Sequence, residues 1–214
     1  MRALGLPMML AAGVMAFSLG GHAAGGAPST TDWPCPQRKV AKLGASDLQW
    51  QGAPVDGLKG WREDRDIAKL VETLSNRRIA IEQAIGSLKT YAAALPTTER
   101  TGKLTLVFAG LLDTVNNYRA SVITGIERFN RRQKLRSAEI EQEGQKLAEL
   151  QRAADKDPAA KIEYQKALEL YDWNTRVFEE RRQNLPLACE IPPAIDGRIF
   201  EVVREIQGLM GQPG

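Results

Sequence analysis

The chain has 214 residues, of which 43% are hydrophobic, so it can bury a modest core and does not have the composition of a disordered protein. Its formal net charge of +3 is too close to neutrality to indicate a polyanionic partner, and we expect no nucleic acid to bind.

The chain opens with Met1 and Arg2, which are followed by an almost uncharged run from Ala3 to Gly20. Small residues at Gly21 and Ala23 then mark a cleavage site. We predict a signal peptide over residues 1–23, cleaved after Ala23, and therefore an exported protein that is periplasmic or secreted. An uncleaved anchor is the alternative, but the apolar run of about 17 residues is shorter than the roughly 20 that a spanning helix needs.

Cleavage would remove His22, which is the single histidine of the sequence. Histidine is the usual general acid or base near neutral pH and the commonest transition-metal ligand. Its loss excludes Ser-His-Asp and Cys-His catalysis, His-ligated zinc and c-type haem. The sequence also lacks a phosphate-binding glycine loop and the G-x-S-x-G, H-E-x-x-H and paired C-x-x-C motifs. We therefore predict no catalytic residues, cofactor or metal site, and an enzyme that uses carboxylates alone is the remaining enzymatic alternative.

Residues 24–61 are predicted to form an irregular N-terminal segment, because they show no sustained hydrophobic period and contain several turn-forming residues. We expect four of its apolar residues to pack against helices: Val40, Leu43, Leu48 and Trp50. The segment contains Cys35, and the only other cysteine of the chain is Cys189. In an exported protein these two are expected to form a disulfide, with a reactive free thiol as the alternative.

Residues 62–95 are predicted to form one helix. Apolar residues recur there at strict seven-residue spacing, at Ile67, Leu74, Ile81, Leu88 and Leu95. This stripe is typical of a coiled coil, and Arg77 and Arg78 interrupt it halfway.

A second helix is predicted to begin near Thr97 or Thr98, either of which can cap it, and to run to about Ala154. Gly125 and Gly144 are the places where it would bend or break. A third helix is predicted from Pro158, with Asp157 as its cap, to Leu185, where Pro186 ends it. A fourth is predicted from about Asp196 to Met210.

Short connections make successive helices antiparallel neighbours. Reversals at Pro96 and Pro158 would place the first and third helices against the two halves of the second, so that both cysteines return to its middle. We therefore predict an all-α fold: an elongated antiparallel helical bundle over residues 62–214, with a projecting coiled-coil hairpin at about 136–176 and one disulfide that links the N- and C-terminal segments.

The stretch "RFNRRQKLR" concentrates basic residues that would suit an acidic partner or an anionic lipid. They are Arg128, Arg131, Arg132, Lys134 and Arg136. Pairing within the protein is the alternative, because the predicted hairpin brings Glu179 and Glu180 beside Arg131 and Arg132. Farther along the same helix, Glu139 and Glu143 share one face and could bind a hard cation, although carboxylates at this spacing are common on solvated helices.

Aromatic residues lie at helical spacing on the third predicted helix, at Tyr164, Tyr171, Trp173 and Phe178, with Phe129 opposite. Two interpretations are open: these aromatic side chains are buried in a core, or they form an exposed surface that binds a partner. Since Tyr171 and Trp173 point to different faces, we expect one of them to be exposed.

These features predict a non-catalytic scaffold, adaptor or chaperone-like accessory whose coiled-coil hairpin binds another envelope protein. Self-association through the hairpin into a homodimer is a further expectation, because two helices leave part of their apolar stripe uncovered. The alternative function is an envelope-surface or anionic-ligand-binding protein, in which the Arg128 to Arg136 cluster contacts a membrane surface or a small anion.

Overall fold

The computed structural model describes residues 32–211, so the predicted signal peptide, its cleavage site and His22 lie outside the described residues. Within residues 32–211 there are five α-helices and two short 3-10 helices, and no strand. The helices are α1 (Arg65–Ser75), α2 (Ile81–Ala94), α3 (Thr97–Ala154), α4 (Ala160–Cys189) and α5 (Ile191–Met210). The 3-10 helices are η1 (Ser46–Leu48) and η2 (Gly60–Arg62). The predicted all-α fold is confirmed.

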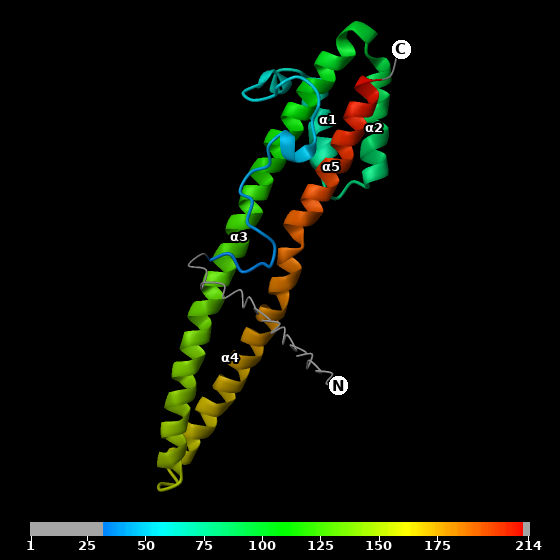
Figure 1. Cartoon of the computed structure of the whole chain (residues 1–214). Coiled ribbons are helices and arrows are strands. Elements are labelled where there is room, and N and C mark those ends of the chain that lie inside the picture. Colours follow the sequence, from blue (N-terminus) through cyan, green and yellow to red (C-terminus); the bar gives the residue numbers. More distant parts are fainter. Residues whose placement is uncertain (1–31, 212–214) are drawn as a thin grey trace, which may run out of the picture. The chain divides into compact units, whose positions relative to one another are not determined.

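The helix α3 organises the described part of the chain (Figure 1). It has 58 residues and, at 1.5 Å per residue, is about 87 Å long. It is continuous through Gly125 and Gly144, so neither glycine breaks it. Helices α1 and α5 pack against its first half, α2 packs against α1 and α5, and α4 runs back along its second half.

The single helix predicted over residues 62–95 is wrong, because α1 and α2 are separate helices joined by residues 76–80. Asn76 adopts extended backbone angles, and its side-chain Oδ1 accepts a hydrogen bond from the Arg78 backbone N–H at 3.0 Å. Arg198 of α5 donates to the carbonyls of Leu74 and Ile79 on either side of the break, at 3.0 Å each. A distant side chain thus supplies the hydrogen bonds that a continuous helix would have made internally.

The predicted boundaries near Pro158, Pro186 and the Pro192–Pro193 pair also need correction. Helix α4 begins at Ala160, while Asp157 accepts a hydrogen bond from the Ala159 N–H just before it. Pro186 does not end α4 but lies inside its last turn, where a missing N–H costs one helical hydrogen bond. Helix α5 begins at Ile191 rather than near Asp196, because Pro192 and Pro193 fit the first turn, where N–H groups have no partner in the helix.

The main core lies between α1, α2, α5 and the first half of α3. Its largest fully buried side chains include Phe108, Ile67, Leu74, Leu88, Leu104, Leu111, Ile199 and Ile206. By contrast, none of residues 127–188 is buried. We call residues 127–188 the α3–α4 hairpin.

The irregular N-terminal segment packs across α3, as predicted. Leu43 and Leu48 are buried in the main core, Val40 packs at its edge, and Trp50 stacks on Phe108 with ring centroids 4.1 Å apart. Two polar side chains of α3 hold the backbone of this segment. Asn116 accepts from the Leu43 N–H at 2.8 Å and donates to the Leu43 carbonyl at 2.9 Å. Arg119, whose side chain is only 4% exposed, donates to the Val40 carbonyl and to both carboxylate oxygens of Asp196 in α5.

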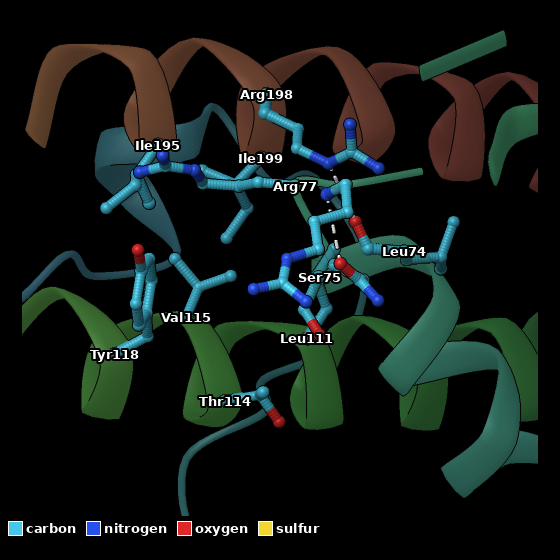
Figure 2. A pocket seen from close by; sticks show the side chains of 12 residues that line it. Leu74, Ser75, Arg77, Leu111, Thr114, Val115, Tyr118, Ile195, Arg198 and Ile199 are labelled. Atoms are coloured by element: carbon cyan, nitrogen blue, oxygen red, sulfur yellow. Dashed lines mark hydrogen bonds between the residues drawn. The ribbon is translucent and has the colours of Figure 1, made fainter. Parts of the chain in front are cut away.

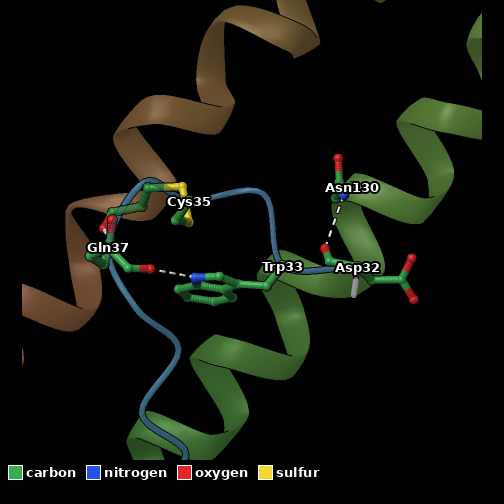
Figure 3. The surroundings of a disulfide bond; sticks show 6 residues. Asp32, Trp33, Cys35, Gln37 and Asn130 are labelled. Carbon is green, nitrogen blue, oxygen red and sulfur yellow. Dashed lines mark hydrogen bonds between the residues drawn. A yellow bond between two sulfur atoms is a disulfide. The ribbon is translucent and has the colours of Figure 1, made fainter. Parts of the chain in front are cut away.

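The predicted disulfide is present. Cys35 and Cys189 are bonded, with their Cα atoms 5.5 Å apart (Figure 3). Both pack against Ile126 near the middle of α3. Trp33 donates from its indole N–H to the Gln37 carbonyl, and the Gln37 amide donates to the Cys189 carbonyl. The disulfide thus joins the N-terminal segment to the junction of α4 and α5.

Candidate functional site

The contact between the two helices of the α3–α4 hairpin follows a coiled-coil spacing. On α3, the half-buried positions alternate steps of three and four residues: Gln133, Arg136, Ile140, Glu143, Leu147, Leu150 and Ala154. On α4, the half-buried positions include Tyr164, Ala167, Tyr171, Asn174 and Phe178. We call these two rows the hairpin seam.

The middle of the hairpin seam is polar. Arg136 donates to Glu139 at 2.7 Å and to Glu143 at 3.0 Å, and Asn174 donates to Glu143 at 3.0 Å. Hydrogen bonding to Glu139, followed by Glu143, raises the pKa of Arg136 although partial burial acts against this. The predicted basic-cluster residue Arg136 is therefore part of the seam, and the predicted cation ligands Glu139 and Glu143 already bind it. Within residues 32–211, no group of three or more His, Cys, Asp or Glu side chains is arranged to hold a metal ion.

The two aromatic residues singled out on α4 lie on different faces. Tyr171 is half-buried in the seam and packs over Gly144, where a Cβ atom would lie 3.4 Å from the tyrosine ring. Trp173 points away from α3 and is 61% exposed. The outer surface of α4 therefore carries the aromatic side chain that is free to meet another molecule.

Trp173 belongs to a larger apolar surface. Ile162 and Leu170 are each 61% exposed, and their spacing from Trp173 places all three on one face of α4. Lys166 and Arg176 flank them. We call Ile162, Lys166, Leu170, Trp173 and Arg176 the α4 outer face.

Two surface cavities adjoin the α4 outer face and share Lys166 and Leu170. One, of about 560 Å³, surrounds Trp173, and the other, of about 340 Å³, opens between α3 and α4 over Leu147 and Tyr171. The exposed apolar face and the hairpin seam thus form one continuous grooved surface.

The remaining predicted basic residues behave differently from one another. Arg131 binds the carboxylate of Asp32 at 2.9 Å, and Lys134 lies 3.8 Å from the same group. The predicted pairing with Glu179 and Glu180 is not found in residues 32–211, because Glu179 binds Arg182 on its own helix at 2.8 Å. Arg128 and Arg132 are exposed and form no ion pair within that range.

Asp32 lies directly before the disulfide loop, and its backbone carbonyl also accepts a hydrogen bond from Asn130 of α3 at 2.9 Å (Figure 3). Three of the five basic residues therefore have partners within the protein. The contacts of Arg131 and Lys134 with Asp32 fix the start of the described chain to α3 and strengthen the attachment that the disulfide makes.

Sequence reasoning missed Ile162 and Leu170. The signal was available, because residues 162, 170 and 173 recur at helical spacing opposite the stripe of Tyr164, Tyr171 and Phe178. Because α4 has apolar residues on two faces and packs against α3 with only one of them, the other apolar face stays exposed.

Comparison of the chain with protein-family models, with curated proteins and with solved structures found no match. In the described part of the chain, none of the helices combines the length and apolar character required to cross a membrane.

Proposed function

We propose that the protein is an exported, non-catalytic helical scaffold or adaptor that binds an amphipathic helix of another envelope protein on the α3–α4 hairpin. The observation that carries the proposal is the exposed Leu170 and Trp173 on a hairpin that buries none of its own residues. A third helix laid in the groove beside them would cover the apolar seam, as in a three-stranded coiled coil.

The charges around the groove support a protein helix as the occupant rather than an anionic membrane. Residues 136–176 contain seven basic and nine acidic side chains, a net charge of −2. The cavity over the seam has Lys146 and Lys166 together with Glu143 and Glu163 at its edges. A partner helix with alternating charges fits such an edge, whereas an anionic lipid surface would be repelled by the net charge.

The disulfide supports an oxidising compartment, which agrees with the predicted signal peptide and with a periplasmic or secreted location. It also supports the mechanical part of the proposal. The main core and the disulfide hold the base of the hairpin, so that its outer part presents the binding surface on two long helices.

A photo-crosslinking amino acid at position 170 of the full chain, expressed in its own envelope, tests this proposal. Position 145 is the matched control, because Gln145 is exposed at the same level of the hairpin on α3 but away from the α4 outer face. We expect an adduct at position 170, none at 145, and loss of the adduct when Trp173→Glu is added. Mass spectrometry should locate the crosslink in an amphipathic helix of the partner.

Three outcomes would overturn the adaptor proposal. Equal crosslinking at positions 145 and 170 would show that the contact is unspecific. An adduct that survives Trp173→Glu would move the interface away from the α4 outer face. An adduct with a second copy of the chain alone would assign the hairpin to a homodimer instead.

The alternative function, contact with an anionic membrane surface, rests on Arg128 and Arg132, which are exposed and form no ion pair within residues 32–211. Co-sedimentation with vesicles that contain anionic phospholipid tests it. If this function holds, Arg128→Glu with Arg132→Glu abolishes sedimentation, while Arg152→Glu with Arg204→Glu, an equal charge change elsewhere, preserves it. Arg131 is unsuited to this test because its loss would also release Asp32.

A further inference from the structure

A cavity of about 520 Å³ opens where α1 gives way to α2, at the side of α3 and α5 and distant in the sequence from the hairpin (Figure 2). Its volume lies within the range of small-molecule sites, about 300–1,000 Å³. Aliphatic side chains from three helices contribute to its wall: Leu74, Leu111, Val115, Ile195 and Ile199. These residues belong to the main core, so the wall is held by packing that does not depend on a ligand.

Three arginines line the same cavity, and no acidic residue does. Arg77 and Arg78 come from the break between α1 and α2, and Arg198 comes from α5. None of the three forms an ion pair within residues 32–211. Glu82 and Glu201 are close enough to Arg198 to raise its pKa, but burial is the larger influence and lowers it. The cavity is therefore a concentration of positive charge without a carboxylate in contact with it.

Arg198 carries the strongest sign of a missing partner. Its Nε and Nη1 donate to the carbonyls of Leu74 and Ile79, but its Nη2 is buried and has no hydrogen-bond partner among the described residues. A buried donor without an acceptor is costly, but Nη2 is closed off from the cavity, so a ligand there would meet the charge of Arg198 rather than bond to this atom. The position of the guanidinium is fixed by its two other bonds, so its charge is held beside the cavity before any ligand binds.

Arg77 extends the charged side of the cavity. Its guanidinium carbon lies 5.8 Å from the centre of the Tyr118 ring, and that ring is 44% exposed (Figure 2). Thr114 and Ser75 also line the cavity, and the Ser75 hydroxyl donates to the backbone carbonyls of Val71 and Glu72. Cationic, hydroxyl and aliphatic groups are thus combined in one concave site.

We propose that this cavity binds a small amphiphile, with a single carboxylate or phosphate head group between Arg77, Arg78 and Arg198 and a short apolar chain against the aliphatic wall. The two head groups share one recognition chemistry, since an arginine donates paired hydrogen bonds to either. The proposed ligand site is separate from the α3–α4 hairpin, so the two proposals stand or fall independently.

Calorimetric titration of the full mature chain tests the site with four probes: octyl phosphate, octanoate, inorganic phosphate and octanol. We expect at least one of the two anionic amphiphiles to bind with 1:1 stoichiometry, and the two together identify the preferred head group. Octanol, which lacks the charge, and inorganic phosphate, which lacks the chain, should each bind at least tenfold more weakly.

Arg77→Glu with Arg78→Glu is the informative variant, because both residues are exposed and neither packs in the core, so the fold should be retained. We expect it to weaken binding at least tenfold. Arg128→Glu with Arg132→Glu is the matched control with the same charge change on the hairpin, and it should bind as tightly as the unmodified chain. Far-UV circular dichroism verifies that both variants are folded.

The proposal is overturned if neither amphiphile binds at millimolar concentration, or if octanol binds as tightly as the better of the two anionic amphiphiles. Equal binding of inorganic phosphate and octyl phosphate would remove the apolar part of the site. If Arg128→Glu with Arg132→Glu weakens amphiphile binding and Arg77→Glu with Arg78→Glu does not, the anion binds the basic cluster of α3 instead of the cavity.

Discussion

The close approach of η2 and α1 to α3 at Gly110 leads to a quantitative prediction. A Cβ atom at position 110 would lie 2.7 Å from an atom of the Trp61 ring and 2.8 Å from a methyl carbon of Val71, closer than real Cβ contacts. Val71 is only 1% exposed and cannot move into solvent. Gly110→Ala should therefore overpack the core at a cost of about 1–3 kcal/mol, and since alanine also gains about 1 kcal/mol in helix propensity, the net loss of unfolding free energy should be about 0–2 kcal/mol.

Gly125 lies in the same helix and supplies the control. A Cβ atom there would meet nothing within 4 Å, so Gly125→Ala adds helix propensity alone and should stabilise the protein by about 1 kcal/mol. The propensity gain is the same at both positions, and it cancels when the two variants are compared. The difference between them, about 1–3 kcal/mol in favour of Gly125→Ala, is the packing cost at position 110.

Urea unfolding followed by circular dichroism at 222 nm measures both free energies by linear extrapolation. If Gly110→Ala is as stable as Gly125→Ala, or more stable, the packing of η2 and α1 on α3 is refuted. A Gly125→Ala variant that is less stable than the unmodified chain would instead refute the open surroundings of α3 at that position.

Three further predictions concern the contacts that hold the N-terminal segment and the helix starts. Reducing the Cys35–Cys189 bond, which closes a loop with a sequence separation of 154, should lower the unfolding free energy by up to about 5 kcal/mol and raise the urea m-value, and an unchanged midpoint would contradict this. Arg119→Met should cost about 1–3 kcal/mol because it leaves the Val40 carbonyl without its donor and removes the ion pair of the partly exposed Asp196, and a neutral effect in the same assay would show that the contact contributes nothing. Asp64 caps α1, and hydrogen bonds from Lys103 and from backbone N–H groups hold the pKa of its carboxyl below the usual value. The ionised Asp64 contributes fully to the unfolding free energy above about pH 4, and this contribution is lost as the pH falls through the lower pKa of the folded state. Asp64→Asn should therefore make the unfolding free energy less dependent on pH in acid. An unchanged pH profile would argue against the cap.

The sequence allowed the prediction of the all-α class, the two reversals and the disulfide because each depends on local chemistry. Pro96 and Pro158 disrupt helix formation wherever they stand between two amphipathic stretches, and the cysteines have no other partner in the chain. The break at Asn76 was missed because the seven-residue stripe continues on both sides of it. Periodicity reports which face of a helix is apolar, but it does not report whether the backbone between two such stretches is continuous.

The errors about the charged residues have a different origin. Arg131 binds Asp32, which lies 99 residues earlier in the sequence, so helical spacing could not reveal this contact. The partners of Arg136, by contrast, lie three and seven residues farther along the same helix, and the basic cluster was considered without them. Pro186 was taken as the end of a helix, yet a proline within one turn of a C-terminus removes a single hydrogen bond, and packing of the α4–α5 junction against α3 offsets that loss. For Arg131 and Pro186, a tertiary contact selected one of two locally acceptable conformations.

The cystine lies where the buried interior ends and the solvated hairpin begins. Since no residue from 127 to 188 is fully buried, amide hydrogens beyond this level should exchange with solvent faster than those of the core helices. The covalent link prevents fraying from spreading past Cys189 into the interior. Opening of the hairpin would therefore leave the rest of the described chain folded.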